Sequence, residues 1–147
     1  MSVSLLDVNV LVALIDPAHV HFDAAHRWFS SLKNDKWATC PITVNGCVRV
    51  LSRPGYAGRP LSVAEACELL LSVCRRPNHE FWPDDLSLFN GSQFHLSKLN
   101  GPGQVTDVYL LALAVARNGH LATFDRTIPW HAVRGAAQSH LRILGGG

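Results

Sequence analysis

The segment Ser2-Val-Ser-Leu-Leu-Asp-Val-Asn-Val-Leu-Val-Ala-Leu-Ile15 decides the fold. Its first part, Ser2–Leu6, is short and apolar enough to form a buried strand at the centre of a parallel sheet. Asp7 follows that strand inside an otherwise apolar stretch, which continues as far as Asp16-Pro17. Ligands of open parallel sheets bind beyond the carboxyl ends of the strands, so Asp7 lies where a functional site is expected.

The rest of the chain alternates between strand and helix patterns. Helical patterns cover residues 21–32, 42–51, 105–118 and a segment that runs from the capping box Ser62–Glu65 to Cys74. Short apolar strand patterns cover residues 2–6, 37–40, 80–82, 120–124 and 141–144. Gly119 stands where the 105–118 helix is expected to end. This alternation predicts an α/β fold, a three-layer α/β/α sandwich around a central parallel sheet.

Length and composition favour one globular domain. The chain has 147 residues, of which 48% are hydrophobic and 16% charged, which excludes a disordered protein. We expect a single domain over residues 1–144 and a flexible glycine tail at 145–147. The formal net charge of +2 excludes a strongly basic nucleic-acid coat. A nuclease that contacts RNA over a limited patch stays possible, because local arrangement matters more than net charge.

The four cysteines favour a reducing compartment. They occur at positions 40, 47, 67 and 74 without a C-x-x-C pair, so we expect buried apolar side chains in preference to a zinc site. The apolar run near the amino terminus has no basic flank and is too short to span a bilayer. Neither a signal peptide nor a membrane anchor is therefore expected, and the predicted location is the cytoplasm.

Three acidic residues are predicted to share one edge of the sheet. Asp7 follows the first strand, Asp125 follows the strand that ends at Phe124, and Asp107 lies in the first turn of the 105–118 helix. Taken singly, Asp107 could complement the helix dipole, Asp125 could lie in a solvated turn, and Asp7 could end its strand. Together they suggest a metal site, because clustered carboxylates repel one another unless a cation such as Mg²⁺ or Mn²⁺ keeps them ionised.

Four segments resemble the VapC family, the PIN-domain ribonuclease toxins of type II toxin–antitoxin systems. They are Leu5-Leu-Asp-Val-Asn-Val-Leu11, Thr43-Val-Asn-Gly-Cys-Val-Arg49, Gln104-Val-Thr-Asp-Val-Tyr-Leu-Leu-Ala112 and Leu121-Ala-Thr-Phe-Asp-Arg126. The resemblance implies a Mg²⁺-dependent endoribonuclease of structured RNA, with tRNA or rRNA as substrate. It also implies a VapB-type antitoxin, a homodimer, and catalytic, metal-binding roles for Asp7, Asp107 and Asp125.

The chain departs from this family pattern at Val44. The family has glutamate at this place, typically in Thr-Glu-Asn-Gly, and valine cannot bind a metal. The adjacent Asn45 is a poor substitute, because successive helix positions point about 100° apart. We therefore expect reduced or absent nuclease activity. The alternative is a catalytically inactive PIN fold that binds RNA or the antitoxin without cutting.

Several polar residues could support the acidic site. Asn9 could orient Asp7 or a coordinated water, or cap a helix; it also argues against a haloacid-dehalogenase-like phosphatase, which needs an aspartate there. Thr43 and Thr106 are expected mainly as helix caps, with possible supporting roles. Thr123 could contact phosphate or simply pack. The candidate phosphate-binding residues, which could equally be isolated surface arginines, are Arg49, Arg126 and Arg134.

Overall fold

The computed structural model describes residues 2–56 and 61–145. The described strands are β1 (Ser4–Leu6), β2 (Trp37–Thr39), β3 (His79–Phe81), β4 (His120–Thr123) and β5 (Leu141–Ile143). The described α-helices are α1 (Val8–Ile15), α2 (Phe22–Ser31), α3 (Pro41–Leu51), α4 (Val63–Cys74) and α5 (Val105–Ala116). The sequence suggested a loop over residues 56–60 and a glycine tail at 145–147. Most of both, residues 57–60 and 146–147, lies outside the described residues.

The strands form one parallel sheet in the order β3-β2-β1-β4-β5, which confirms the predicted α/β class. β1 is the central strand, and Leu5 pairs with Ala38 on one side and Leu121 on the other. Every residue of β1 is buried, as its apolar sequence indicated. Because β1 and β4 are parallel neighbours, the residues that follow them emerge together at one edge of the sheet.

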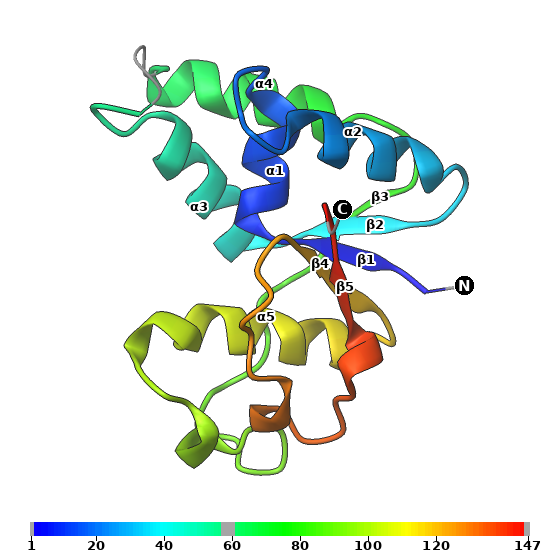
Figure 1. Cartoon of the computed structure of the whole chain (residues 1–147), viewed down its shortest axis with the longest axis vertical. Coiled ribbons are helices and arrows are strands. Elements are labelled where there is room, and N and C mark those ends of the chain that lie inside the picture. Colours follow the sequence, from blue (N-terminus) through cyan, green and yellow to red (C-terminus); the bar gives the residue numbers. More distant parts are fainter. Residues whose placement is uncertain (1, 57–60, 146–147) are drawn as a thin grey trace.

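Helices cover both faces of the sheet (Figure 1). Leu5 and Leu121 belong to a core with α5, whereas Leu6 and Ala122 belong to a second core with α1–α4. This division follows from the pleat, since successive side chains of a strand point to opposite faces. The protein is therefore a three-layer α/β/α sandwich, as expected. No helix in the described residues is long and apolar enough to cross a membrane.

The carboxyl end of α5 differs in detail from the prediction. The residue in the left-handed conformation is Asn118, at φ 58°, and not the expected Gly119. Asn118 N–H donates to Val115 O at 3.1 Å and Gly119 N–H donates to Ala114 O at 2.8 Å, the two bonds of a Schellman motif. Gly119 is required for a different reason, because an added Cβ would lie 2.3 Å from the backbone oxygen of Val3, the residue before β1. Glycine therefore lets α5 turn directly into β4.

The edge strand β3 begins one residue earlier than predicted, at His79, and ends at Phe81. Trp82 is buried just beyond it, where its indole N–H donates to Glu80 Oε1 at 3.1 Å. The backbone N–H of Trp82 also donates to Thr39 O of β2 at 2.8 Å, so the pairing of β3 with β2 continues to Trp82, where the sequence pattern ended the strand.

Candidate metal centre

Three acidic side chains come together from three elements, as the sequence predicted. Asp7 directly follows β1, Asp125 follows β4 after one residue, and Asp107 lies in the first turn of α5. Asp7 N–H donates to Ala122 O at 2.9 Å, which continues the pairing of β1 with β4 by one residue. The charges of Asp7 and Asp125 both raise the pKa of Asp107, which shows that the three carboxylates are electrostatically coupled.

Asp7 is the buried member of this acidic cluster, with only 5% of its surface exposed. Its Oδ1 accepts the Val8 N–H at 2.7 Å, and its Oδ2 accepts the Thr123 hydroxyl at 2.7 Å. Burial raises the pKa of Asp7, the two hydrogen bonds oppose that rise, and the charge of Asp125 adds to it. Asp7 also begins α1, since its backbone carbonyl accepts the Leu11 N–H.

Thr123 organises the cluster from within the protein. Its side chain is completely buried, so it cannot reach a phosphate as one of the two earlier interpretations suggested. The hydroxyl donates to Asp7 and accepts the backbone N–H of Asp125 at 3.0 Å. It thereby links the ends of β1 and β4, which is more than simple packing.

Asn9 reaches the same group of residues from the first turn of α1. Its Nδ2 donates to Thr123 Oγ1 at 3.3 Å, and its Oδ1 accepts the Phe124 N–H at 3.3 Å. Asn9 therefore orients Asp7 indirectly, through Thr123, and it ties α1 to the segment that carries Asp125. The helix cap that was considered for Asn9 is instead provided by Asp7.

Asp107 has no hydrogen-bond partner for its carboxylate among the described residues, although it is partly buried. Its pKa is raised to about 6, first by burial and then by the charges of Asp7 and Asp125. An acidic group in this state gains strongly from a nearby cation, because the cation offsets both the desolvation and the repulsion. Asp107 is therefore the member of the cluster whose ionised form most needs a bound ion.

Asp125 is fixed by a residue that sequence reasoning missed. Thr127 donates its N–H and its hydroxyl to Asp125 Oδ1, at 2.8 and 2.6 Å. The pattern Asp-x-Thr is typical of such a turn, in which a side-chain oxygen accepts from the backbone two residues later, and could have revealed it. The second carboxylate oxygen, Oδ2, accepts no hydrogen bond within the described residues and is available to another ligand.

The donor set of this cluster suits a hard divalent cation. Carboxylate oxygens are the ligands that Mg²⁺ prefers, and no lysine or arginine is paired with Asp7, Asp107 or Asp125 among the described residues. No three of the described acidic, histidine or cysteine side chains converge tightly enough to enclose an ion by themselves. The residues thus fit Mg²⁺ that keeps part of its water shell, as this ion commonly does in proteins.

The two predicted helix caps have different outcomes. Thr43 is buried, and its hydroxyl accepts the Cys40 N–H at 3.0 Å, so it stabilises the start of α3 as expected. Thr106 does not cap α5: the residue at the cap position is Gln104, and Thr106 is exposed in the first turn. The cap prediction for Thr106 was wrong because a 3₁₀ turn, Pro102–Gln104, leads straight into the helix.

Val44 lies on the face of the sheet that α1–α4 cover. It packs in the core formed with α1–α4 and lines an apolar pocket of about 350 Å³ with Thr39, Leu70 and Phe81. None of the three aspartates lines this pocket. Gly46 of α3 lies close to the start of α1, because an added Cβ there would lie 2.6 Å from Val8 Cγ2.

The three candidate arginines are all exposed. Arg49 lies in the last turn of α3, and Arg126 directly follows Asp125. Arg134 has a structural contact as well, since its Nε donates to Gly91 O at 2.7 Å. Arg49 and Arg126 form no ion pair in the described part of the chain, so their charges are free to meet a phosphate.

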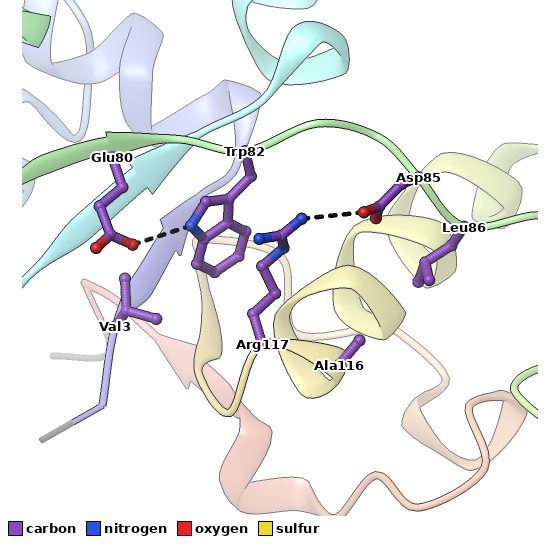
Figure 2. A pocket seen from close by; sticks show the side chains of 7 residues that line it. All are labelled: Val3, Glu80, Trp82, Asp85, Leu86, Ala116 and Arg117. Atoms are coloured by element: carbon purple, nitrogen blue, oxygen red, sulfur yellow. Dashed lines mark hydrogen bonds and ion pairs between the residues drawn. The ribbon is translucent and has the colours of Figure 1, made fainter.

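A separate pocket of about 470 Å³ lies beside Val3, between the segment Glu80–Leu86 and the carboxyl end of α5 (Figure 2). Its polar groups are already paired: Arg117 forms an ion pair with Asp85 at 3.2 Å, and its guanidinium lies 5.4 Å from the Trp82 ring centroid. Glu80 in turn accepts the Trp82 N–H. Because these charges satisfy one another, and the pocket lies at the opposite end of β1 from Asp7, we assign no function to it.

Replacing Thr123 with valine is expected to destabilise the protein by about 2 kcal/mol, because the buried Asp7 carboxylate loses a partner. The pKa of Asp7 should rise further, since the Thr123 hydrogen bond lowers it. Denaturant unfolding with EDTA at neutral pH measures this change. Thr123→Ser keeps the hydroxyl and serves as the control; a loss of stability in Thr123→Ser with none in Thr123→Val would mean that the methyl group, and not the hydrogen bonds, matters.

Comparisons with known proteins identify relatives of this chain. The sequence model of the PIN domain family matches residues 4–133. Ribonuclease VapC44 of Mycobacterium tuberculosis (strain CDC 1551 / Oshkosh) is 47% identical over 141 residues, which cover 96% of this chain and 99% of the relative. Ribonuclease VapC39 of the same strain is 40% identical over 135 residues, which cover 92% and 97% of the two chains.

Proposed function

This chain belongs to the PIN domain family, among its VapC-type ribonucleases, and from this premise we propose a Mg²⁺-dependent endoribonuclease toxin that cuts structured RNA. The catalytic and metal-binding residues in this proposal are Asp7, Asp107 and Asp125. The observation that carries it is the coupled acidic cluster at the carboxyl ends of β1 and β4, in which the pKa of Asp107 is raised to about 6. Such perturbed groups are typical of functional sites.

The aspartates and threonines of this site have different proposed roles. Asp107 and the free Oδ2 of Asp125 would hold the ion, and Asp7 would add its charge from a buried position. Thr123 and Thr127 keep two of the carboxylates in place through the hydrogen bonds described above. When bound there, a divalent ion would supply Lewis-acid chemistry for the hydrolysis of a phosphodiester near neutral pH.

The partners follow from the family. We propose a VapB-type antitoxin, an RNA substrate such as tRNA or rRNA, and a homodimeric assembly. A single PIN domain over residues 1–144 would carry all of these contacts. We also propose the cytoplasm as the location, because the four cysteines are unpaired, two of them in the core.

Val44 is the feature that favours the second candidate function, an inactive PIN fold that only binds RNA or antitoxin. The family glutamate is missing at this position, and the valine side chain packs among apolar residues. We propose that the remaining three aspartates still support cleavage, at a reduced rate.

The proposed function is tested by incubating the purified chain with a total tRNA and rRNA mixture. We expect slow cleavage with millimolar Mg²⁺ and none with EDTA. Thermal unfolding gives an independent readout, because an ion that binds the folded state raises Tm by mass action. Cleavage that persists in EDTA would contradict the metal proposal. Mg²⁺-dependent stabilisation without any cleavage would favour the inactive binding module.

A further inference from the structure

We propose that the RNA substrate lies on one particular surface, here named the acid-free lobe, and that the Phe89 ring stacks on an unpaired base there. The lobe comprises residues 86–104 and 126–140. It lies below the sheet in Figure 1, on the side of α5 and away from α1–α4. This inference rests on the proposed ribonuclease function and adds where and how the substrate is held.

The distribution of charge sets the lobe apart. All of the acidic residues of the chain lie outside it, although the whole chain has 11 of them. The lobe carries three basic residues, Lys98, Arg126 and Arg134, and all three are exposed. None of the three forms an ion pair within the residues that the structure describes. A surface with unpaired cations and no acids attracts a polyanion even when the net charge of the protein is small.

The two segments of the lobe form one body. Phe94 and Val133 make an antiparallel bridge, and Arg134 N–H donates to Gln93 O at 2.9 Å. His95 N–H donates to Ala132 O at 2.8 Å, so the hydrogen bonds continue on both sides of the bridge. Phe94 and Val133 are also buried against α5. The two segments are therefore held together and against α5, and they form one defined surface.

Phe89, in the first segment of the lobe, is 97% exposed and presents its ring to solvent. The loop that carries it is anchored: Arg134 Nε donates to Gly91 O, and Phe89 N–H donates to Ser87 Oγ at 3.1 Å. A fully exposed phenylalanine on an anchored loop contributes nothing to the core. Aromatic rings of this kind stack on the bases of single-stranded or looped RNA, and this contact needs no particular base.

The lobe also borders the acidic cluster. Its first segment ends at Gln104, the cap residue of α5, three positions before Asp107. Its second segment begins at Arg126, directly after Asp125. RNA that contacts the lobe would therefore have its backbone close to the residues proposed to cut it.

A binding experiment tests this proposal without cleavage. A fluorescein-labelled single-stranded oligonucleotide of mixed sequence is titrated with the full chain in EDTA, and its anisotropy is measured. We expect Phe89→Ala to weaken binding by about fivefold or more. The matched control is Phe81→Ala, because Phe81 is 59% exposed on β3, outside the lobe, and its removal should leave affinity unchanged. A fully paired RNA duplex should be insensitive to Phe89→Ala.

The charge of the lobe is tested with Lys98→Gln against Arg75→Gln, an exposed basic residue at the end of α4. Only the first change should reduce the salt dependence of binding, by about one phosphate contact.

Unchanged RNA affinity of Phe89→Ala, in a chain that still binds and cuts RNA, would overturn the lobe proposal and leave the proposed function intact. If Phe89→Ala lost self-association but kept normal RNA affinity, the lobe would be a protein interface, and the proposal that it binds RNA would be overturned. A chain that neither binds nor cuts RNA would overturn the proposed function itself.

Discussion

Replacement of Asp107 by asparagine is expected to lower Mg²⁺-dependent RNA cleavage by about a hundredfold or more, while it makes the metal-free protein more stable at neutral pH. The loss of activity follows because asparagine keeps the shape of the side chain but brings no negative charge to the ion. The gain in stability follows because the charge of Asp107 is unfavourable without that ion, as its raised pKa shows. A merely structural aspartate would not show both effects.

The sign and the pH range of the stability change follow from the pKa of about 6. Protonated Asp107 favours the folded state below its ordinary pKa of 3.8, and this contribution is lost as the pH rises through about 6. Asparagine stays neutral, so the advantage of the variant should be absent at pH 4 and complete above pH 7. The full shift corresponds to about 3 kcal/mol, which solvent screening of a partly exposed group reduces to about 1–2 kcal/mol.

Thermal unfolding in EDTA at pH 4 and pH 7.5 measures this difference, which should appear as a Tm increase of about 2–6 °C at the higher pH only. Asp84→Asn, which changes an exposed aspartate outside the acidic cluster, serves as the control. Addition of Mg²⁺ should stabilise the original chain more than the Asp107→Asn variant. Unchanged Mg²⁺ stabilisation in the variant would show that Asp107 is not a metal ligand.

Val44→Glu is expected to raise RNA cleavage by about tenfold or more, because it adds a fourth carboxylate near the start of α3. The same change should cost about 1–3 kcal/mol of stability, since Val44 lines an apolar pocket with Leu70 and Phe81. The two effects are expected to have opposite directions, because valine packs among apolar residues there, whereas glutamate is proposed to add a charge to the site.

The control for this prediction is Val44→Gln, which has nearly the same shape and a similar loss of apolar contact but no charge. RNA cleavage rates of the three proteins are compared at one Mg²⁺ concentration, and denaturant unfolding gives their stabilities. Only the glutamate variant should gain activity. Equal cleavage by the original chain and a folded Val44→Glu variant would show that position 44 does not belong to the active site.

Much of the fold could be predicted because its signals are local. A short, mostly apolar strand such as Ser4–Leu6 is typical of the buried centre of a parallel sheet. The capping box of Ser62 and Glu65 formed as expected, since both of its hydrogen bonds join residues three positions apart. The end of α5 was less certain, because either Asn118 or Gly119 could adopt the left-handed conformation. The close approach of Val3 decided between them.

The acidic cluster was predictable in part. Asp7 and Asp125 each follow a strand, and parallel topology brings the carboxyl ends of neighbouring strands to one edge. Thr123 could not be placed in this way, because its role depends on the pairing of β1 with β4, residues more than 100 positions apart. The packing partners of Val44 could not be predicted either, because the sequence does not show which elements pack against each face of α3.

The sequence by itself therefore determined the α/β class, the edge at which the acids gather and the family, because apolar periodicity and strand-end position are local properties. Only the tertiary structure decided that Thr123 holds Asp7, that Val44 packs into an apolar pocket, and that Phe89 and the unpaired cations share one lobe. The physical reason is that hydrogen bonds, burial and repulsion act between residues brought together from distant parts of the chain.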